Sequence, residues 1–181
     1  MDQDPSIETE RSLNCQLHAV LVRVFETGVV IIGDSGIGKS ECALDLVSRG
    51  HRLVADDAVE IYADGDKLTG VPPKLTRHLL EIRGLGIIDV GTIFGSDSVC
   101  AESSVDLCVE LRKLTGVDRL ENVVSEYRIA GRGIPKFMLP VSSGRNLATL
   151  VETAVRLYRK GAIGRAAARL MDDHAKLINP A

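Results

Sequence analysis

The chain has 181 residues, of which 45% are hydrophobic, 26% charged and 3% aromatic, and its net charge is −3 at pH 7. This length supports one hydrophobic core, and the composition is that of a folded globular domain. Few aromatic rings and a negative balance argue against a nucleic-acid partner, and no apolar run is long enough to span a membrane.

The first dozen residues are polar, and the acidic start MDQDPSIETE is unlike a signal peptide. We expect residues 1–15 to be a flexible lead-in, or the stub of a missing domain, and residues 16–181 to form the folded catalytic unit. The four cysteines, Cys15, Cys42, Cys100 and Cys108, have no C-x-x-C spacing and have apolar or small neighbours. This pattern indicates buried free thiols in a reducing compartment, so we expect a cytoplasmic protein.

In chain order, β-branched residues predict strands over 18–26 and 29–32, joined at Thr27 and Gly28. A helix is predicted over 39–48 and ended by Gly50. Two further strands are expected on either side of the pair Asp56 and Asp57, followed by a turn over 63–66.

The second half of the chain is less regular. Residues 79–95 contain too many glycines for a long helix and predict a loop with short structured pieces. Strict alternation over 104–111 predicts a half-buried strand. An apolar stripe predicts a helix over 145–160, and another helix is expected over 164–178.

The segment that follows the 29–32 strand carries a phosphate-binding motif. Gly33, Gly38, Lys39 and Ser40 occupy every fixed position of G-x-x-x-x-G-K-[ST]. In such a loop, glycines let backbone N–H groups turn toward phosphate oxygens, lysine neutralises phosphate charge and the hydroxyl can bind Mg²⁺. A strand before the loop and a helix after it agree with the motif, so we expect a triphosphate, diphosphate or pyrophosphate ligand.

The acidic pair Asp56 and Asp57 is a candidate for the proton transfer that a kinase needs. No guanine-reading N-K-x-D stretch is present, and Asp56 and Asp57 follow the loop closely. Adjacent strand residues face opposite ways, so both carboxylates can serve one site only if the strand ends there. One would then face a metal ion and the other accept a proton from an incoming hydroxyl. The alternative is that one caps the following turn and the other is solvated.

Five segments together carry a family resemblance: LHAVLV, GDSGIGKSECALDLVSRGHRLVADDAVEIY, HLLEIRGLGIIDV, DRL and IPKFMLPVSSGRN. The chain resembles the catalytic domain of bacterial HPr kinase/phosphorylase from about Leu17 to its end. The resemblance implies an α/β fold, with a P-loop-containing mixed β-sheet core and flanking helices, related to phosphoenolpyruvate carboxykinase. It also implies a serine kinase that uses ATP or pyrophosphate with Mg²⁺ to phosphorylate the phosphocarrier protein HPr, and a phosphorylase that removes this phosphate with inorganic phosphate. The implied assembly is a homo-hexamer.

The resemblance also implies roles for individual residues. The implied catalytic residues are His18, Lys39, Asp56 and Arg119, with Asp56 as base in one direction and acid in the other, and His18 lying against it. The implied metal ligands are Ser40 and Glu81, and Asp57 is a further candidate. The implied nucleotide-binding loop comprises Gly33, Asp34, Ser35, Gly36, Ile37, Gly38, Lys39 and Ser40. The loop implied for the phosphorylase direction comprises Pro140, Val141, Ser142, Ser143, Gly144 and Arg145.

One position departs from the family pattern, because Ala19 stands where a glycine usually follows the histidine. Its methyl group could crowd the site. Two other functions stay open: a kinase of another protein or small-molecule acceptor, and a nucleotide-sensing module that binds without transferring phosphate. Glu81, Arg83 and Arg119 could also be ordinary charged surface or contact residues.

Overall fold

The computed structural model describes residues 12–113 and 124–162 of the chain. Its strands are β1 (Leu13–His18), β2 (Val20–Val24), β3 (Thr27–Gly33), β4 (Arg52–Ala55), β5 (Ala58–Asp64), β6 (Lys67–Val71), β7 (Leu79–Ile82), β8 (Gly86–Asp89), β9 (Ser103–Ser104), β10 (Leu107–Lys113), β11 (Val124–Ile129) and β12 (Arg132–Val141). Its α-helices are α1 (Lys39–Ser48), α2 (Val90–Phe94) and α3 (Leu147–Arg159), and short 3-10 turns lie at Lys74–Thr76 and Ser96–Ser98.

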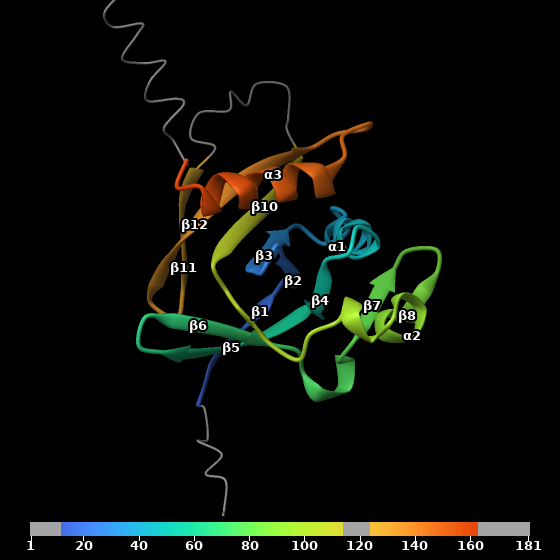
Figure 1. Ribbon diagram of the computed structural model, residues 1–181, viewed down its shortest axis with the longest axis horizontal. Coiled ribbons are helices and arrows are strands. Elements are labelled where there is room, and N and C mark those ends of the chain that lie inside the picture. Colours follow the sequence, from blue (N-terminus) through green and yellow to red (C-terminus); the bar gives the residue numbers. More distant parts are fainter. Residues whose placement is uncertain (1–11, 114–123, 163–181) are drawn as a thin grey trace, which may run out of the picture.

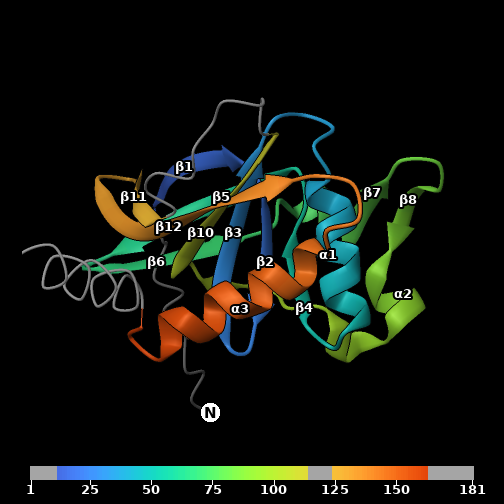
Figure 2. The same cartoon turned by 90° about the horizontal axis from the view of Figure 1, so that it is seen from above.

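The described residues form a mixed α/β fold in layers. A six-stranded sheet has the order β11-β12-β10-β3-β2-β4, and a four-stranded sheet has the order β1-β5-β6-β9. Helices α1 and α3 lie on one side of the larger sheet, and β5 and β6 lie on the other, as Figures 1 and 2 show. One buried cluster joins the sheet to the two helices and a second joins the two sheets. None of the described helices is long and apolar enough to cross a membrane.

Strand direction brings several loops to one edge of the larger sheet. Strands β3, β10 and β12 run parallel, while β2 is antiparallel to both β3 and β4. The carboxyl ends of β3, β4, β10 and β12 therefore lie at the same edge, together with the start of β2. This is the edge where open α/β sheets bind their ligands.

The predicted strand over 104–111 is corrected in its start and its burial. Strand β10 begins at Leu107, and Cys108 on its polar face is as fully buried as Val109 on its apolar face. Both faces are covered because β10 pairs with parallel strands on both sides and lies between the helices and the smaller sheet. The alternation in sequence therefore does not mark a solvent-exposed face.

The predicted strand over 18–26 is two strands. The chain leaves the smaller sheet at His18, and after the fully buried Ala19 it enters the larger sheet at Val20. The turn to β3 lies at Phe25 and Glu26, not at Thr27 and Gly28, because Val24 pairs with Thr27. Both turn residues have positive φ, 47° and 65°, which is the geometry of a type I′ hairpin.

Gly28 belongs to β3 and fixes the start of β10. Its N–H donates to Asp106 Oδ2 over 2.8 Å, and its carbonyl oxygen accepts from Asp106 N–H over 2.9 Å. A Cβ on Gly28 would overlap the carbonyl oxygen of Ser104, so a side chain cannot fit. With Asp106 held there, Leu107 pairs with Val29 and Leu111 pairs with Gly33.

The remaining predictions mostly agree with the structure. Helix α1 spans the predicted residues, α3 begins two residues later than expected with Asn146 as its N-cap, and residues 79–95 form the β7–β8 hairpin and the short α2. Strand β1 begins at Leu13, earlier than the expected start of the fold at residue 16. The helix predicted over 164–178 lies outside the described residues.

All four cysteines are free thiols, as predicted, but only Cys42 and Cys108 are buried. Burial raises the pKa of each of these two thiols to about 12, so both stay protonated and unreactive at neutral pH. Cys15 and Cys100 are half-buried.

Candidate active site

The glycine-rich loop between β3 and α1 presents backbone amides without side-chain competition. Gly36 and Gly38 have φ of 73° and 109°, which only glycine adopts without strain. Gly38 is the N-cap of α1 and makes no side-chain cap hydrogen bond. The first amides of α1 and the positive end of its dipole are therefore directed at the loop, which is an arrangement that favours an anion.

Lys39 is buried inside this loop. Its Nζ donates to the carbonyl oxygens of Gly33 over 2.9 Å and of Asp34 over 3.2 Å. These two bonds hold the ammonium group beneath the loop backbone. A buried cation next to open amides gives this part of the site a positive potential.

Asp56 follows the last residue of β4 and is buried. Its Oδ1 accepts from the Ser40 hydroxyl over 2.9 Å, and its Oδ2 accepts from the Glu81 N–H over 3.0 Å. Burial raises the pKa of Asp56 above its ordinary value, while these hydrogen bonds act in the opposite direction. The carboxylate therefore joins the first turn of α1 to the β7–β8 hairpin.

Asp57 turns away from Asp56 and reaches His18. It has φ of 64°, and His18 Nδ1 lies 3.0 Å from both its carboxylate Oδ1 and its carbonyl oxygen. The expected contact of His18 with the catalytic carboxylate is thus made with Asp57 instead of Asp56. The methyl group of Ala19 is buried in the core between the sheets and does not crowd the site.

Most of these groups line one cavity of about 240 Å³. Because β4 ends at Ala55, both aspartates reach it, as the sequence argument requires. Its lining residues are His18, Ser35, Gly36, Gly38, Lys39, Ser40, Glu41, Asp56, Asp57, Glu81 and Arg83. Of the predicted loop, Gly33, Asp34 and Ile37 do not line it, and Ile37 packs into the core instead.

The segment predicted for the phosphorylase direction does not line this cavity. Pro140 and Val141 end β12, and Ser142, Ser143, Gly144 and Arg145 connect it to α3; none of these six residues lines the cavity. They lie at the same sheet edge, because Lys113 pairs with Val141 and Leu111 with Gly33. Arg119 lies outside the described residues.

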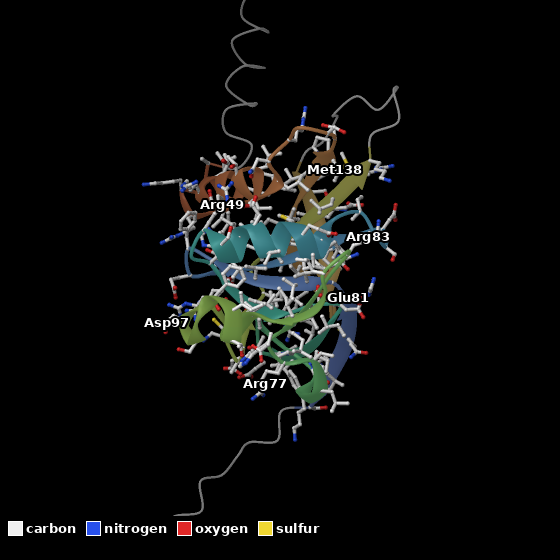
Figure 3. The ribbon with its side chains drawn as sticks, turned by 90° about the vertical axis from the view of Figure 1, so that its right-hand side faces the viewer. Arg49, Arg77, Glu81, Arg83, Asp97 and Met138 are labelled. Carbon is white, nitrogen blue, oxygen red and sulfur yellow. The ribbon has the colours of Figure 1, made fainter. Side chains whose placement is uncertain are left out.

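Two cavity residues were not predicted as site residues. Glu41 is in the first turn of α1, and Arg83 follows β7. The sequence contained an indication for Arg83, because side chains alternate along a strand. Leu80 and Ile82 are buried, so Glu81 and Arg83 face outward. Figure 3 shows Glu81 and Arg83 on the hairpin, with Arg83 at the end of α1 opposite to Arg49.

The oxygen donors of the cavity suit a hard cation. The Ser40 hydroxyl and the carboxylates of Glu81 and Asp57 line it together with the loop. Within residues 12–113 and 124–162, no group of three or more His, Cys, Asp or Glu side chains is placed to hold a metal ion. This donor set fits Mg²⁺, which takes one or two protein ligands and completes its shell with water and phosphate oxygens.

Comparison with known proteins agrees with the resemblance. The sequence matches the family described as HPr Serine kinase C-terminal domain over residues 10–175. It is 46% identical over 166 residues to HPr kinase/phosphorylase of Levilactobacillus brevis, covering 90% of this chain and 53% of that protein. It is 46% identical over 171 residues to HPr kinase/phosphorylase of Streptococcus thermophilus, covering 89% and 55%. The chain thus spans about half the length of these curated relatives.

The fold also matches a solved structure. HPr(Ser) kinase/phosphatase from Coxiella burnetii superposes with a TM-score of 0.75 and 35% sequence identity, over 87% of this chain and 98% of that one. This match confirms the expected mixed α/β fold. Together with the sequence match, it shows that the chain belongs to the HPr serine kinase C-terminal domain family.

Proposed function

We propose that this chain is a protein-serine kinase and phosphorylase acting on the phosphocarrier HPr. One observation carries the proposal: a buried carboxylate, Asp56, shares a cavity with an anion-binding loop and is hydrogen-bonded to the hydroxyl at the motif's last position. Phosphoryl transfer needs a phosphate cradle, a cation and a proton acceptor within reach of one another. The names of the relatives supply the acceptor, HPr.

In the kinase direction, loop 33–40 holds the phosphates of ATP or pyrophosphate through its backbone amides. Lys39 neutralises their charge, and Arg119 is the proposed second cation at the transferred group. Asp56 takes the proton of the acceptor serine as the serine oxygen attacks the terminal phosphorus, and the bond to the leaving group breaks, which releases ADP from ATP or phosphate from pyrophosphate. The raised pKa of Asp56 suits a carboxylate that must hold this proton.

Mg²⁺ would bind at Ser40 and Glu81, with Asp57 as a further ligand, and would neutralise charge on the phosphates. In the phosphorylase direction, inorganic phosphate attacks the phosphoserine, Asp56 returns its proton to the serine oxygen and pyrophosphate is released. His18, through Asp57, orients the segment that carries Asp56. Segment 140–145 is the proposed entry side for inorganic phosphate, because it ends at the same sheet edge.

We further propose that one catalytic domain extends from β1, which begins at Leu13, to residue 181, related in fold to phosphoenolpyruvate carboxykinase and built on a P-loop. The functional assembly is a homo-hexamer in the cytoplasm. Analytical ultracentrifugation of the 181-residue chain tests the assembly directly, and a monomer would contradict this part of the proposal.

The reaction is tested by intact-mass spectrometry of HPr. The purified chain is incubated with HPr, Mg²⁺ and either ATP or pyrophosphate, with Asp56→Asn as the matched variant. We expect one phosphate on a serine of HPr, none with the variant, and removal of the phosphate when inorganic phosphate is added to the wild type. Nucleotide binding without transfer would instead favour another acceptor or a sensor.

A further inference from the structure

Arg83 lies against the glycine-rich loop from the hairpin side. Leu80 and Ile82 are buried, so Glu81 and Arg83 both face the cavity. The position that a Cβ on Gly36 would occupy is 2.7 Å from Arg83 Nη2. The guanidinium group therefore contacts the glycine-rich part of the loop at Gly36, and Figure 3 shows Arg83 beside the start of α1.

Arg83 has no carboxylate partner among the described residues. Other arginines of this chain form ion pairs, such as Arg49 with Asp45 and Arg23 with Glu26. Arg83 makes neither an ion pair nor a hydrogen bond to any residue in 12–113 or 124–162. All donors of its planar group thus remain available in a site built for an anion.

Arg83 is one of the few positive charges among the residues that line the cavity. Its lining carries four carboxylates, at Glu41, Asp56, Asp57 and Glu81, and two fixed cations, at Lys39 and Arg83. The ammonium of Lys39 already bonds to two loop carbonyl groups. Arg83 is therefore the lining cation whose hydrogen-bond donors are unused among the described residues. It lies beside the loop, while Glu81 on the same hairpin donates its N–H to Asp56.

We propose that Arg83 is a phosphate-binding residue whose guanidinium donates two hydrogen bonds to the phosphate that loop 33–40 holds. The inference rests on the proposed function and deepens it, because it divides the hairpin between two tasks. Glu81 serves the metal and proton side of the cavity, and Arg83 serves the phosphate chain. A two-pronged contact with phosphate is the geometry that arginine provides and lysine does not.

The test is calorimetric titration of the 181-residue chain with pyrophosphate and Mg²⁺. Four proteins are compared: the wild type, Arg83→Gln, Arg83→Lys and Arg77→Gln. Arg77 is an exposed arginine outside the cavity with no ion pair in the described part of the chain, so its variant changes the net charge equally. Figure 3 shows it well away from Arg83.

We expect Arg83→Gln to weaken pyrophosphate binding about 10- to 100-fold, the loss typical of charged hydrogen bonds. Arg83→Lys should weaken it less, since it keeps the charge, and Arg77→Gln should bind within about twofold of the wild type. Wild-type affinity in Arg83→Gln would overturn the proposal. If Arg83→Gln fails to fold, wild-type affinity in Arg83→Lys overturns the two-pronged contact.

The same measurement separates this inference from the proposed function. Absence of pyrophosphate and ATP binding by the wild type would overturn the proposed function itself. Pyrophosphate binding that depends on Arg83, in a chain that does not phosphorylate HPr, would leave the inference standing while the acceptor assignment fails.

Discussion

The Ser40 hydroxyl donates a hydrogen bond to Asp56 Oδ1 over 2.9 Å, although the two residues come from different elements. This bond joins the last position of the phosphate motif to the proposed base. It holds the carboxylate beside the place where a metal-bound phosphate would lie, and it makes Asp56 central to both stability and activity.

Asp56→Asn should stabilise the protein at neutral pH while strongly slowing phosphoryl transfer. Burial raises the folded-state pKa of Asp56, so its stabilising contribution is complete below its ordinary pKa of 3.8 and is lost as pH rises through the raised value. Asparagine removes the penalty for the buried charge. We expect a higher melting temperature for the variant at pH 7 and a difference that shrinks toward pH 3, with transfer reduced about 10²- to 10⁴-fold.

Asp57→Asn is the matched control, because Asp57 is exposed and asparagine tolerates its φ of 64°. Its melting temperature should stay close to that of the wild type at every pH. A melting temperature of Asp56→Asn below that of the wild type at pH 7 would contradict the role of burial at Asp56.

Ser40→Ala should weaken the binding of Mg²⁺ with pyrophosphate by about tenfold or more, because it removes a proposed metal ligand. Ser40→Thr should keep the affinity, since the motif accepts either hydroxyl. Ser48→Ala is the control within the same helix, because the Ser48 hydroxyl donates to the Asp45 carbonyl oxygen and does not line the cavity. Titration calorimetry over a range of Mg²⁺ concentrations measures each variant, and equal Mg²⁺ dependence in all three would count against Ser40 as a ligand.

Gly36→Ala should weaken pyrophosphate binding mainly by displacing Arg83. The added methyl group would lie 2.7 Å from Nη2, and the φ of 73° adds backbone strain. In a double-mutant cycle, Gly36→Ala should cost clearly less affinity in an Arg83→Gln background than in the wild type. Strictly additive effects would show that the two residues act independently.

Gly65→Ala serves as the control for strain alone. Gly65 has φ of 52° in the turn between β5 and β6, and no atom of residues 12–113 or 124–162 lies within 4 Å of the added methyl group. This variant should lose some stability but keep its pyrophosphate affinity, which calorimetry and thermal melting report separately.

Glu26→Gly should stabilise the β2–β3 hairpin by about 1 kcal/mol, because glycine adopts positive φ without strain. The loss of the ion pairs of the exposed Glu26 with Arg23 and Arg52 offsets only a little of this gain. Glu26→Ala, which loses both pairs as well but keeps a Cβ, should show no gain in urea unfolding. Equal stability of the two variants would contradict strain at this position.

The phosphate loop was predictable because its glycines and lysine meet conformational and charge requirements that few other residues satisfy. Lys39 and Ser40 lie where the motif puts them, and the end of β4 brings Asp56 and Asp57 to one cavity, as the strand argument required. These features depend on a few neighbouring residues. They can therefore be predicted from the local sequence.

The turn at Phe25 and Glu26 was not predictable from turn propensities, since neither residue favours positive φ. Contacts far along the chain stabilise it: the Phe25 ring packs edge-on against His51 at 4.7 Å, and the Arg156 guanidinium lies 4.4 Å from its centre. The covered polar face of β10 was missed for a similar reason, because the smaller sheet that covers it consists of other segments. Arg83 became a site residue only when the hairpin was placed beside Gly36.

The exchange of hydrogen bonds between Gly28 and Asp106 acts at the end of β3 opposite to the phosphate loop. Gly33 lies five positions after Gly28, about 16 Å along the strand, yet the alignment set at one end decides which β10 residue lies beside the loop. A shift of one residue would turn Glu110 into the helix-facing core and move the loop relative to Lys113 and Val141. A substitution at Gly28 would therefore weaken ligand binding by misaligning the phosphate loop, even in a protein that still folds.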